Sequence, residues 1–264
     1  MALYGVLGDI HGNREALISA LARLDECRVE QIVCVGDLVG YNADPDECVL
    51  LLRLRKAICI AGNHDLIGTG LLGFDKCSNK AMHSLKRTRR VLSGDTAAFL
   101  KSLPAHVVLE GRFLLTHGGV RDVQQYMTQP KHVLENVEYL RSDFPGVRIS
   151  FFGHTHEQKV FEIEDGTVRE RDVNDPVAPV SLRGDCEYFI NPGSVDASRK
   201  RESKLAECAV FDSGKLTVDF HRVTYDDAAT EDKAEAQGYR MDAWRDRLYD
   251  IQRRFAPSRS YTRL

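Results

Sequence analysis

The feature that most restricts the fold is an alternation of short apolar runs with helical patterns. Apolar runs at Leu3 to Leu7, Gln31 to Val35 and Ala57 to Ala61 have the length of buried strands. Between them, Leu17 to Leu24 carries the apolar face of a helix, and Pro45 opens a second helix that runs to Arg55. Strands that alternate with helices form parallel sheets, so the sequence predicts a βαβαβ unit and argues against an all-β fold.

The second half of the chain adds further strands. A hairpin is expected at residues 107–116, and a helix follows with apolar positions from Val133 to Leu140. Residues 147–152 read as another strand, and the pattern stays strand-like up to Val223. The fold class is therefore α/β, and we expect two β-sheets packed face to face with helices outside.

The C-terminal residues predict a helical tail. We assign residues 1–226 to one domain and residues 227–264 to a tail that packs on the same domain. Apolar side chains recur there at spacings of three and four, which is typical of an amphipathic helix. This stripe consists of Met241, Trp244, Leu248, Ile251 and Phe255. Two heptads are too short to establish a coiled coil, so we expect the stripe to cover its own domain.

Composition narrows the class of protein. The chain has 264 residues, 43% of them hydrophobic and 28% charged, which excludes intrinsic disorder. Its net charge of -3 gives no reason to expect nucleic acid or a membrane as the partner. We expect no signal peptide and no membrane span. Seven cysteines without a Cys-x-x-Cys pair indicate reduced thiols and a cytoplasmic protein.

Five short segments that contain glycine carry nearly all of the recognisable chemistry. Each lies at the end of a predicted strand or close to one, where the strands of an α/β sheet present their ligands. The five are Gly8 to Asn13, Gly36 to Asn42, Gly62 to Asp65, Thr116 to Gly119 and Gly153 to His156. Side chains two apart on extended backbone point the same way, so Asp9 and His11 are expected to reach one ion, and His154 and His156 repeat that spacing.

The donor set in these segments points to metal chemistry. Carboxylate, amide and imidazole donors without thiolate suit Mn, Fe, Ni, Co or Zn and disfavour a structural zinc site built from cysteines. Seven ligands are too many for one ion. They are about right for two ions that share a carboxylate roughly 3.5 to 4 Å apart, an arrangement that stabilises both oxygens in phosphoryl displacement.

In this order the five segments resemble the signature of the calcineurin-like metallophosphoesterase superfamily. The phrases Gly36 to Asn42 and Asn191 to Val195, with Arg222 to Asp226, resemble its YfcE-like phosphodiesterase branch. The resemblance covers residues 3–226, and its motifs are specific in combination. It implies a four-layer αββα sandwich of two mixed β-sheets. Gly36 to Asn42 lacks the Arg that Ser/Thr protein phosphatases carry there, which argues against that activity.

The resemblance also implies a role for each candidate residue. The implied ligands are Asp9, His11 and His156 for one metal, Asn63, His117 and His154 for the second, and Asp37 for both. In the implied mechanism a metal-bound hydroxide attacks phosphorus in line, and His64 protonates the leaving alkoxide. Asp65 is the expected orienting partner of His64, although a role as a cap of the next turn stays open.

Residues that bind the substrate are less marked in the sequence. Asn13 is a candidate, but it also has the position of a helix N-cap. Ser194 lies in a Pro-Gly turn that is expected at the edge of the metal site. Arg121 and Arg199 are candidate phosphate-binding residues, because arginine forms a bidentate fork with phosphate.

The sequence therefore predicts a phosphoesterase with two divalent metal ions, manganese being the expected metal. A phosphodiesterase acting on a small phosphorylated molecule is the first hypothesis. A phosphomonoesterase, a dinucleotide hydrolase on the same metal core and a non-catalytic scaffold of the same fold are the alternatives. The charge balance disfavours nucleic acid as the substrate, and the oligomeric state, a homo-oligomer included, is open.

Overall fold

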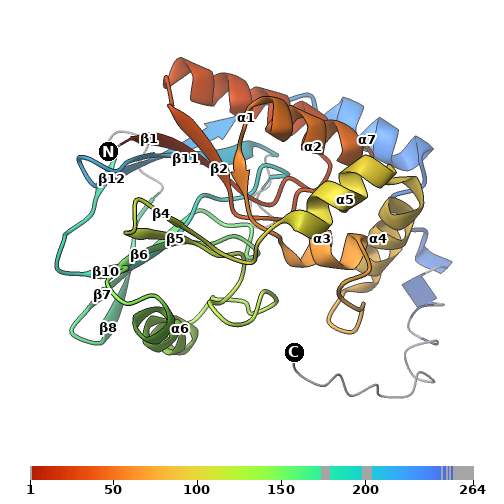
Figure 1. Ribbon diagram of the computed structural model, residues 1–264. Coiled ribbons are helices and arrows are strands. Elements are labelled where there is room, and N and C mark those ends of the chain that lie inside the picture. Colours follow the sequence, from red (N-terminus) through yellow and green to blue (C-terminus); the bar gives the residue numbers. More distant parts are fainter. Residues whose placement is uncertain are drawn as a thin grey trace.

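The computed structural model describes residues 2–173, 179–197, 204–244, 246–247, 249 and 251, and it contains two mixed β-sheets (Figure 1). The first sheet has the order β3-β2-β1-β11-β12-β9 and the second the order β4-β5-β6-β10-β7-β8. The strands of the first are β3 (Ile58–Cys59), β2 (Gln31–Cys34), β1 (Leu3–Leu7), β11 (Ala206–Asp212), β12 (Thr217–Val223) and β9 (Val180–Ser181). Those of the second are β4 (Val107–Leu109), β5 (Phe113–Leu115), β6 (Ile149–Phe151), β10 (Glu187–Asn191), β7 (Lys159–Glu164) and β8 (Thr167–Arg171).

The parallel part of each sheet corresponds to the predicted pattern. Strands β1, β2 and β3 are parallel, as expected for the βαβαβ unit, and β11 extends the sheet antiparallel to β1. In the second sheet β5, β6 and β10 are parallel, and the predicted hairpin is β4-β5. Strand β3 is shorter than predicted, because the Ala61 N–H donates to the Pro104 carbonyl oxygen and no longer to β2. The carboxyl ends of β1, β2, β5 and β6 carry the candidate ligands.

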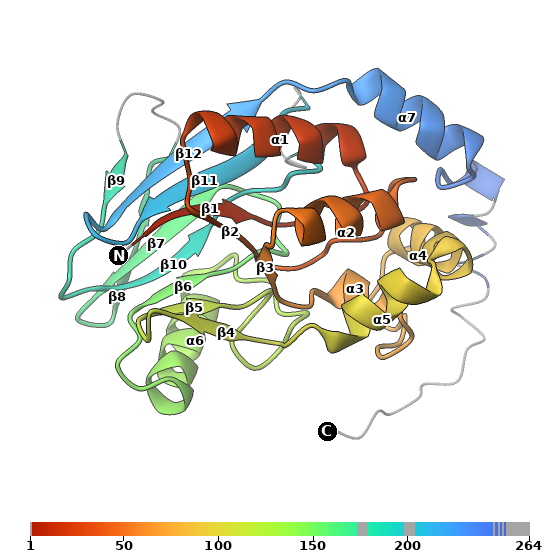
Figure 2. The same cartoon turned by 45° about the horizontal axis from the view of Figure 1, so that its top comes forward.

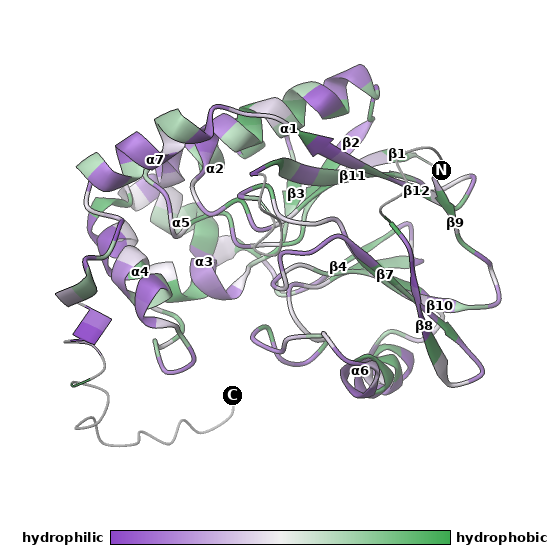
Figure 3. Ribbon diagram, turned by 180° about the vertical axis from the view of Figure 1, so that it is seen from behind, coloured by the Kyte–Doolittle hydropathy of each residue, from purple (hydrophilic) through white to green (hydrophobic). Residues whose placement is uncertain are grey.

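Seven helices have described bounds, and the described residues among 243–251, an interrupted stretch, are also helical. The seven are α1 (Arg14–Glu26), α2 (Pro45–Leu54), α3 (Asn63–Gly68), α4 (Asn79–Val91), α5 (Gly94–Ser102), α6 (Pro130–Asp143) and α7 (Asp227–Ala236). Helix α1 begins where the Asn13 side chain accepts a hydrogen bond from the Ala16 N–H, and α6 begins at Pro130, which favours a first helical turn. Both helices show green and purple faces in Figure 3, as expected for helices that bury one side. No helix in the described ranges combines the length and the apolar character needed to cross a bilayer.

Three apolar layers hold these elements together. One lies between the first sheet and the helices α1 and α2, and includes Leu17 and Leu24. Another lies between the two sheets, and a third joins the second sheet to α6 through Val133 and Val137. Figure 2 shows α1 and α2 on one side of the molecule and α6 on the other. The predicted αββα sandwich of two mixed sheets is confirmed.

Phe211 tests the layer between the sheets. Its ring is 1% exposed, lies 4.9 Å from the Phe113 ring centroid and 5.1 Å from that of Phe151, and so contacts the opposite sheet. We expect Phe211→Ala to lower the free energy of unfolding by about 3–5 kcal/mol, because the cavity cannot close between two sheets. Urea denaturation measures this change. Val108→Ala, at a side chain 41% exposed, is the control and should stay within about 0.5 kcal/mol; an equal loss in both variants would contradict the assignment.

The C-terminal segment contacts the domain through α7 and, within the predicted helix, through Asp246, whose Oδ1 accepts from Asn79 Nδ2 at 2.7 Å. Helix α7 contacts α1 and its N-terminal loop: Thr230 Oγ1 donates to Asn13 Oδ1, and Lys233 Nζ donates to Glu15 and Asp44. These contacts are polar, because α7 carries few apolar side chains. In the predicted stripe, by contrast, Trp244 is 60% exposed. Leu248 and Phe255 of the stripe, with the rest of residues 252–264, lie outside the described residues, so the packing of the whole tail stays a prediction.

Candidate metal centre

The candidate ligands converge where parallel strands of both sheets end. Asp9 and His11 follow β1, and Asp37 follows β2. Asn63 is the first residue of α3, which begins shortly after β3. The second sheet contributes three histidines from the ends of β5 and β6: His117, His154 and His156. The loops that carry the ligands are interlocked by backbone hydrogen bonds, for example from the His11 N–H to the Asp37 carbonyl.

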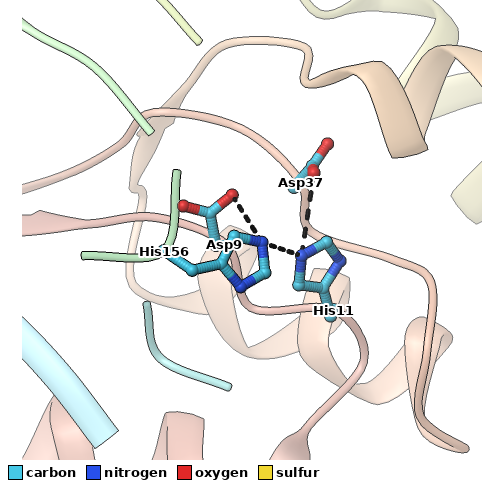
Figure 4. A group of neighbouring side chains, drawn as sticks. All are labelled: Asp9, His11, Asp37 and His156. Atoms are coloured by element: carbon cyan, nitrogen blue, oxygen red, sulfur yellow. Dashed lines mark hydrogen bonds and ion pairs between the residues drawn. The ribbon is translucent and has the colours of Figure 1, made fainter. Parts of the chain in front are cut away.

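These side chains form two groups that share one carboxylate. The first consists of Asp9, His11, Asp37 and His156, shown in Figure 4, and the second of Asp37, His117 and His154. Within each group the potential ligand atoms lie within 4.8 Å of one another, and every member is buried. Asn63 joins the second group, since its Oδ1 lies 3.0 Å from His117 Nε2. The structure thus brings all seven predicted ligands together, in the two sets expected.

The local backbone reaches this arrangement in a way the sequence analysis did not foresee. Asp9 and His11 do belong to one ligand group, as expected, but the extended backbone from which this was predicted is wrong. Five of the candidate ligands have left-handed backbone: Asp9 (φ 52), His11 (φ 53), Asp37 (φ 57), His154 (φ 67) and His156 (φ 54). Such a conformation costs a non-glycine residue on the order of 1 kcal/mol, and it is typically found at functional sites.

The second such spacing, that of His154 and His156, is divided between the two groups. His156 Nε2 lies 3.5 Å from Asp9 Oδ1, whereas the ring of His154 lies against that of His117. The tight turn after β6 is held by the Asp9 carboxylate, which accepts the His154 N–H at 3.0 Å. The sharp turn therefore separates two imidazoles that an extended strand would have kept on one side.

The histidine tautomers fit a cation between the side chains. His117 Nδ1 lies 2.7 Å from the Val35 carbonyl oxygen, and His11 Nδ1 lies 3.3 Å from that of Val39. A carbonyl only accepts, so Nδ1 carries the proton and Nε2 of a neutral ring presents a lone pair. That lone pair faces Asp37 Oδ2, at 3.3 Å from His117 and 3.7 Å from His11. Two acceptors this close require a proton or a cation between them, so the residues fit a metal site.

Electrostatics point to the same conclusion. Burial acts to lower the pKa of His117, but the charge of Asp37 outweighs it and raises that pKa to about 9. Burial and the neighbouring His117 lower the pKa of His154 to about 3, so its ring is neutral. His154 Nε2 is buried without a hydrogen-bond partner. A neutral imidazole with an unused ring nitrogen next to a buried carboxylate is suited to bind a divalent cation.

Asp65 has a different position from the one expected. Its carboxylate accepts hydrogen bonds from the backbone N–H groups of Asp37, Leu38, Val39 and Gly62, at 2.9 to 3.2 Å. As the third residue of α3, its side chain turns back to the N-terminus of the helix, where orphan N–H groups lie. Asp65 therefore shapes the loop that carries Asp37, and the prediction that it orients His64 is corrected.

His64 lies beside both groups. Its backbone N–H donates to Asp37 Oδ1 at 2.7 Å, and its ring centroid lies 4.5 Å from that of His11 and 4.8 Å from that of Tyr41. Gly40 leaves room for this ring, because a Cβ atom there would lie 2.4 Å from His64 Nδ1. The imidazole is thereby fixed next to the candidate metal ligands.

The predicted substrate residues have mixed outcomes. Asn13 caps α1 and lines a cavity beside the site. Ser194 is fully buried and donates to the Asp9 carbonyl oxygen, so it supports the Asp9 loop and is not open to substrate. Arg121 binds the Asp143 carboxylate through two nitrogens and stacks on Tyr139, and this pairing on α6 replaces the expected phosphate contact. Arg199 lies outside the described residues.

Three further residues lie near the site, and two of them, Tyr126 and Arg240, were not predicted from the sequence. Tyr126 lies over His154 with ring centroids 4.0 Å apart, and Tyr41 lies over His11 at 4.7 Å. Arg240, from the segment after α7, donates to the Tyr41 carbonyl oxygen at 2.9 Å and to Asn42 Oδ1 at 3.0 Å. Tyr126 lies in a loop whose sequence shows no recognisable pattern. Arg240 could not be related to the Tyr41–Asn42 loop from the sequence, because 198 positions separate it from Asn42.

Comparison with known proteins identifies the class. The model of the calcineurin-like phosphoesterase superfamily domain matches residues 2–215. This match covers most of the chain and includes every described strand except β12 (Thr217–Val223). The chain belongs to the calcineurin-like phosphoesterase superfamily, as the sequence motifs predicted. Membership implies a phosphoester hydrolase that uses divalent metal ions.

Individual relatives extend this finding over nearly the whole chain. An uncharacterized protein of Methanocaldococcus jannaschii, MJ0912, is 30% identical over 233 residues, which cover 85% of this chain and 88% of that protein. A metallophosphoesterase from Sphaerobacter thermophilus has a TM-score of 0.76 and 27% identity, with 93% of this chain and 97% of that chain covered. The hypothetical protein PH1004 from Pyrococcus horikoshii shares the fold, with a TM-score of 0.69, 17% identity, and coverage of 94% and 97%.

Proposed function

We propose that this protein is a two-metal phosphoesterase and that it hydrolyses phosphodiesters of small molecules. The observation that carries the proposal is the pair of buried ligand groups that share Asp37. A shared carboxylate is the arrangement by which two ions are kept close enough to act on one phosphoryl group. Mn²⁺ is the proposed metal, since the donors are carboxylate, amide and imidazole.

Each residue of the centre has a part in the proposed reaction. Asp9, His11 and His156 would hold one ion, Asn63, His117 and His154 the other, and Asp37 both. When bound, the ions supply a nucleophile near neutral pH and positive charge for the phosphoryl oxygens. His64 gives its proton to the oxygen of the leaving alcohol, in a position fixed by Asp37, His11 and Tyr41. Asp65 holds the Asp37 loop in place through its N–H groups.

A small diester fits the surroundings of the centre. A cavity of about 680 Å³ opens beside His156 and Tyr41, within the range of small-molecule pockets. The net charge of -3 supports a small substrate over nucleic acid. No disulfide bond joins the seven cysteines, all of which lie in described segments, and this supports our proposal of a cytoplasmic location.

Metal-dependent turnover tests the proposal. Protein freed of metal by chelation is assayed on bis-p-nitrophenyl phosphate and p-nitrophenyl phosphate, before and after addition of Mn²⁺, and the bound ions are counted by elemental analysis. We expect activity only with metal, about two ions per chain, and a higher kcat/KM for the diester. A higher value for the monoester would favour a phosphomonoesterase. Failure of every divalent ion to restore turnover in folded protein would favour a binding protein of the same fold.

A further inference from the structure

The cavity beside the centre is built in part by residues beyond the phosphoesterase domain match. His156 and Tyr41 border it on the side of the centre, and Tyr225, Tyr239 and Arg240 also line it. The last three lie after residue 215, where the family match ends. In Figure 2, α7 lies next to α1 and α2, so the C-terminal segment reaches the same end of the sandwich as the ligand loops.

Arg240 connects this segment to the catalytic loops. Its Nε and Nη2 donate to the two carboxylate oxygens of Glu231, at 2.6 and 2.8 Å, which fixes the guanidinium on α7. The guanidinium also binds the Tyr41 carbonyl oxygen and Asn42 Oδ1. Asn42 in turn donates to Asp196 Oδ1 at 2.7 Å, and Asp196 also lines the cavity. One guanidinium therefore fixes the loop whose tyrosine covers His11 and His64.

The position of Tyr41 relates the cavity to the leaving group. Its ring lies 4.8 Å from that of His64, the proposed proton donor, and it lines the cavity. An alcohol that receives its proton from His64 lies on this side of the phosphorus atom. Tyr41 thus contacts both the His64 ring and the cavity, which makes the cavity the neighbouring space on the side of His64.

The lining indicates what kind of alcohol fits. Three cationic side chains, Lys80, Lys204 and Arg240, are balanced by three anionic ones, Asp196, Asp227 and Glu231. Such a balance does not favour a leaving group with a further phosphate, since each carboxylate would repel it. Hydroxyl and amide groups, among them Asn13, Asn42 and Thr230, complete the wall and can exchange hydrogen bonds with hydroxyl groups.

We infer that this cavity is the subsite for the leaving alcohol, that it takes an uncharged group with several hydroxyls, of sugar or nucleoside size, and that Arg240 is a positioning residue of it. The inference rests on the proposed function. It means that the C-terminal segment takes part in substrate selection. Loss of Arg240 would release Tyr41 and open the cavity, while the ligand groups would stay in place and His64 would keep its contacts with Asp37 and His11.

The test uses full-length, Mn²⁺-loaded protein and four methyl phosphodiesters. Their leaving alcohols are glycerol, glycerol 3-phosphate, a nucleoside through its 5′-hydroxyl, and p-nitrophenol, which needs neither hydroxyl contacts nor a proton donor. Release of methyl phosphate is followed by ³¹P NMR. In the unmodified protein we expect kcat/KM for glycerol to exceed that for glycerol 3-phosphate.

Arg240→Ala should lower kcat/KM for the glycerol and nucleoside esters about tenfold or more, mainly through KM, and leave the p-nitrophenyl ester within about twofold. Arg240→Lys keeps the positive charge but cannot form the bidentate contact of the guanidinium. Its kcat/KM for these two esters should lie between those of the unmodified protein and Arg240→Ala. Arg121→Ala is the matched control, because Arg121 also binds one carboxylate through two nitrogens. Melting temperatures of all variants show whether they are folded.

The outcomes separate this inference from the proposed function. An equal loss on all four esters in Arg240→Ala, or no loss, would overturn the subsite. So would a preference of the unmodified protein for glycerol 3-phosphate as the leaving group. If the unmodified protein cleaves no phosphodiester with any divalent ion, the proposed function fails, and the subsite fails with it.

Discussion

Asp37→Asn is expected to abolish the binding of both metal ions and to lower kcat/KM for a phosphodiester on the order of 1,000-fold. Asp37 is the only side chain shared by the two ligand groups, as defined within the described residues. The amide keeps the size of the side chain. Its oxygen can still accept the hydrogen bond from the His64 backbone N–H, which in the unmodified protein has a length of 2.7 Å. It has no negative charge, however, and one oxygen in place of two. The expected loss is therefore specific to the ions.

Elemental analysis and the diester assay measure this effect together. Asp143→Asn is the matched control, since Asp143 is a carboxylate paired with an arginine on the surface and should keep both ions and full activity. Circular dichroism confirms that both variants are folded. An Asp37→Asn protein that retains two ions and normal turnover would show that Asp37 does not bridge them.

His64→Ala should separate chemistry from metal binding. His64 is in neither ligand group, so both ions should remain bound. Removal of a general acid costs about 10²–10⁴-fold in rate when the leaving group is a poor one, such as an alkoxide. p-Nitrophenolate leaves without a proton, so its ester should lose much less. The ratio of the two rate losses is the diagnostic quantity.

The experiment compares the methyl glycerol and methyl p-nitrophenyl phosphodiesters at saturating Mn²⁺. His132→Ala serves as the control, because His132 lies on α6 outside all of the motifs. Equal rate losses on the two esters would mean that His64 contributes in another way than by proton transfer. An unchanged rate on the glycerol ester would remove His64 from the mechanism.

The sequence was sufficient to predict which side chains come together, because each candidate ligand stands in a short segment with its own signature. A polar residue next to glycine at the end of an apolar strand is common by itself, but five such segments in one chain indicate a shared ligand site. The two-sheet sandwich follows from the same strands and from the family resemblance. The family resemblance assigns each of the seven candidate ligands to an ion by the position of its segment along the chain. This assignment can be made before the fold is known.

What the sequence could not supply depends on backbone conformation and on distant contacts. The left-handed conformation of Asp9 and His156 is not visible in a spacing of two residues, although the family resemblance already implied the group of each ligand. The burial of Ser194 depends on where its turn packs, under the Asp9 loop. Asp65 was assigned by its distance from His64 along the chain, whereas helix geometry turns it toward backbone N–H groups.

Because the candidate ligands come from both sheets, metal ions bound here would cross-link the two sheets of the sandwich. Asp9 and Asp37 belong to loops of the first sheet, and His117 and His154 to loops of the second. Ions that bind only the assembled centre add their binding free energy to the stability of the whole fold. Conversely, a substitution that weakens the packing between the sheets, such as one at Phe211, would lower the affinity for the ions. Activity would then depend on the packing between the two sheets. Substitutions in that layer, far from the substrate phosphate, would lower activity through metal binding.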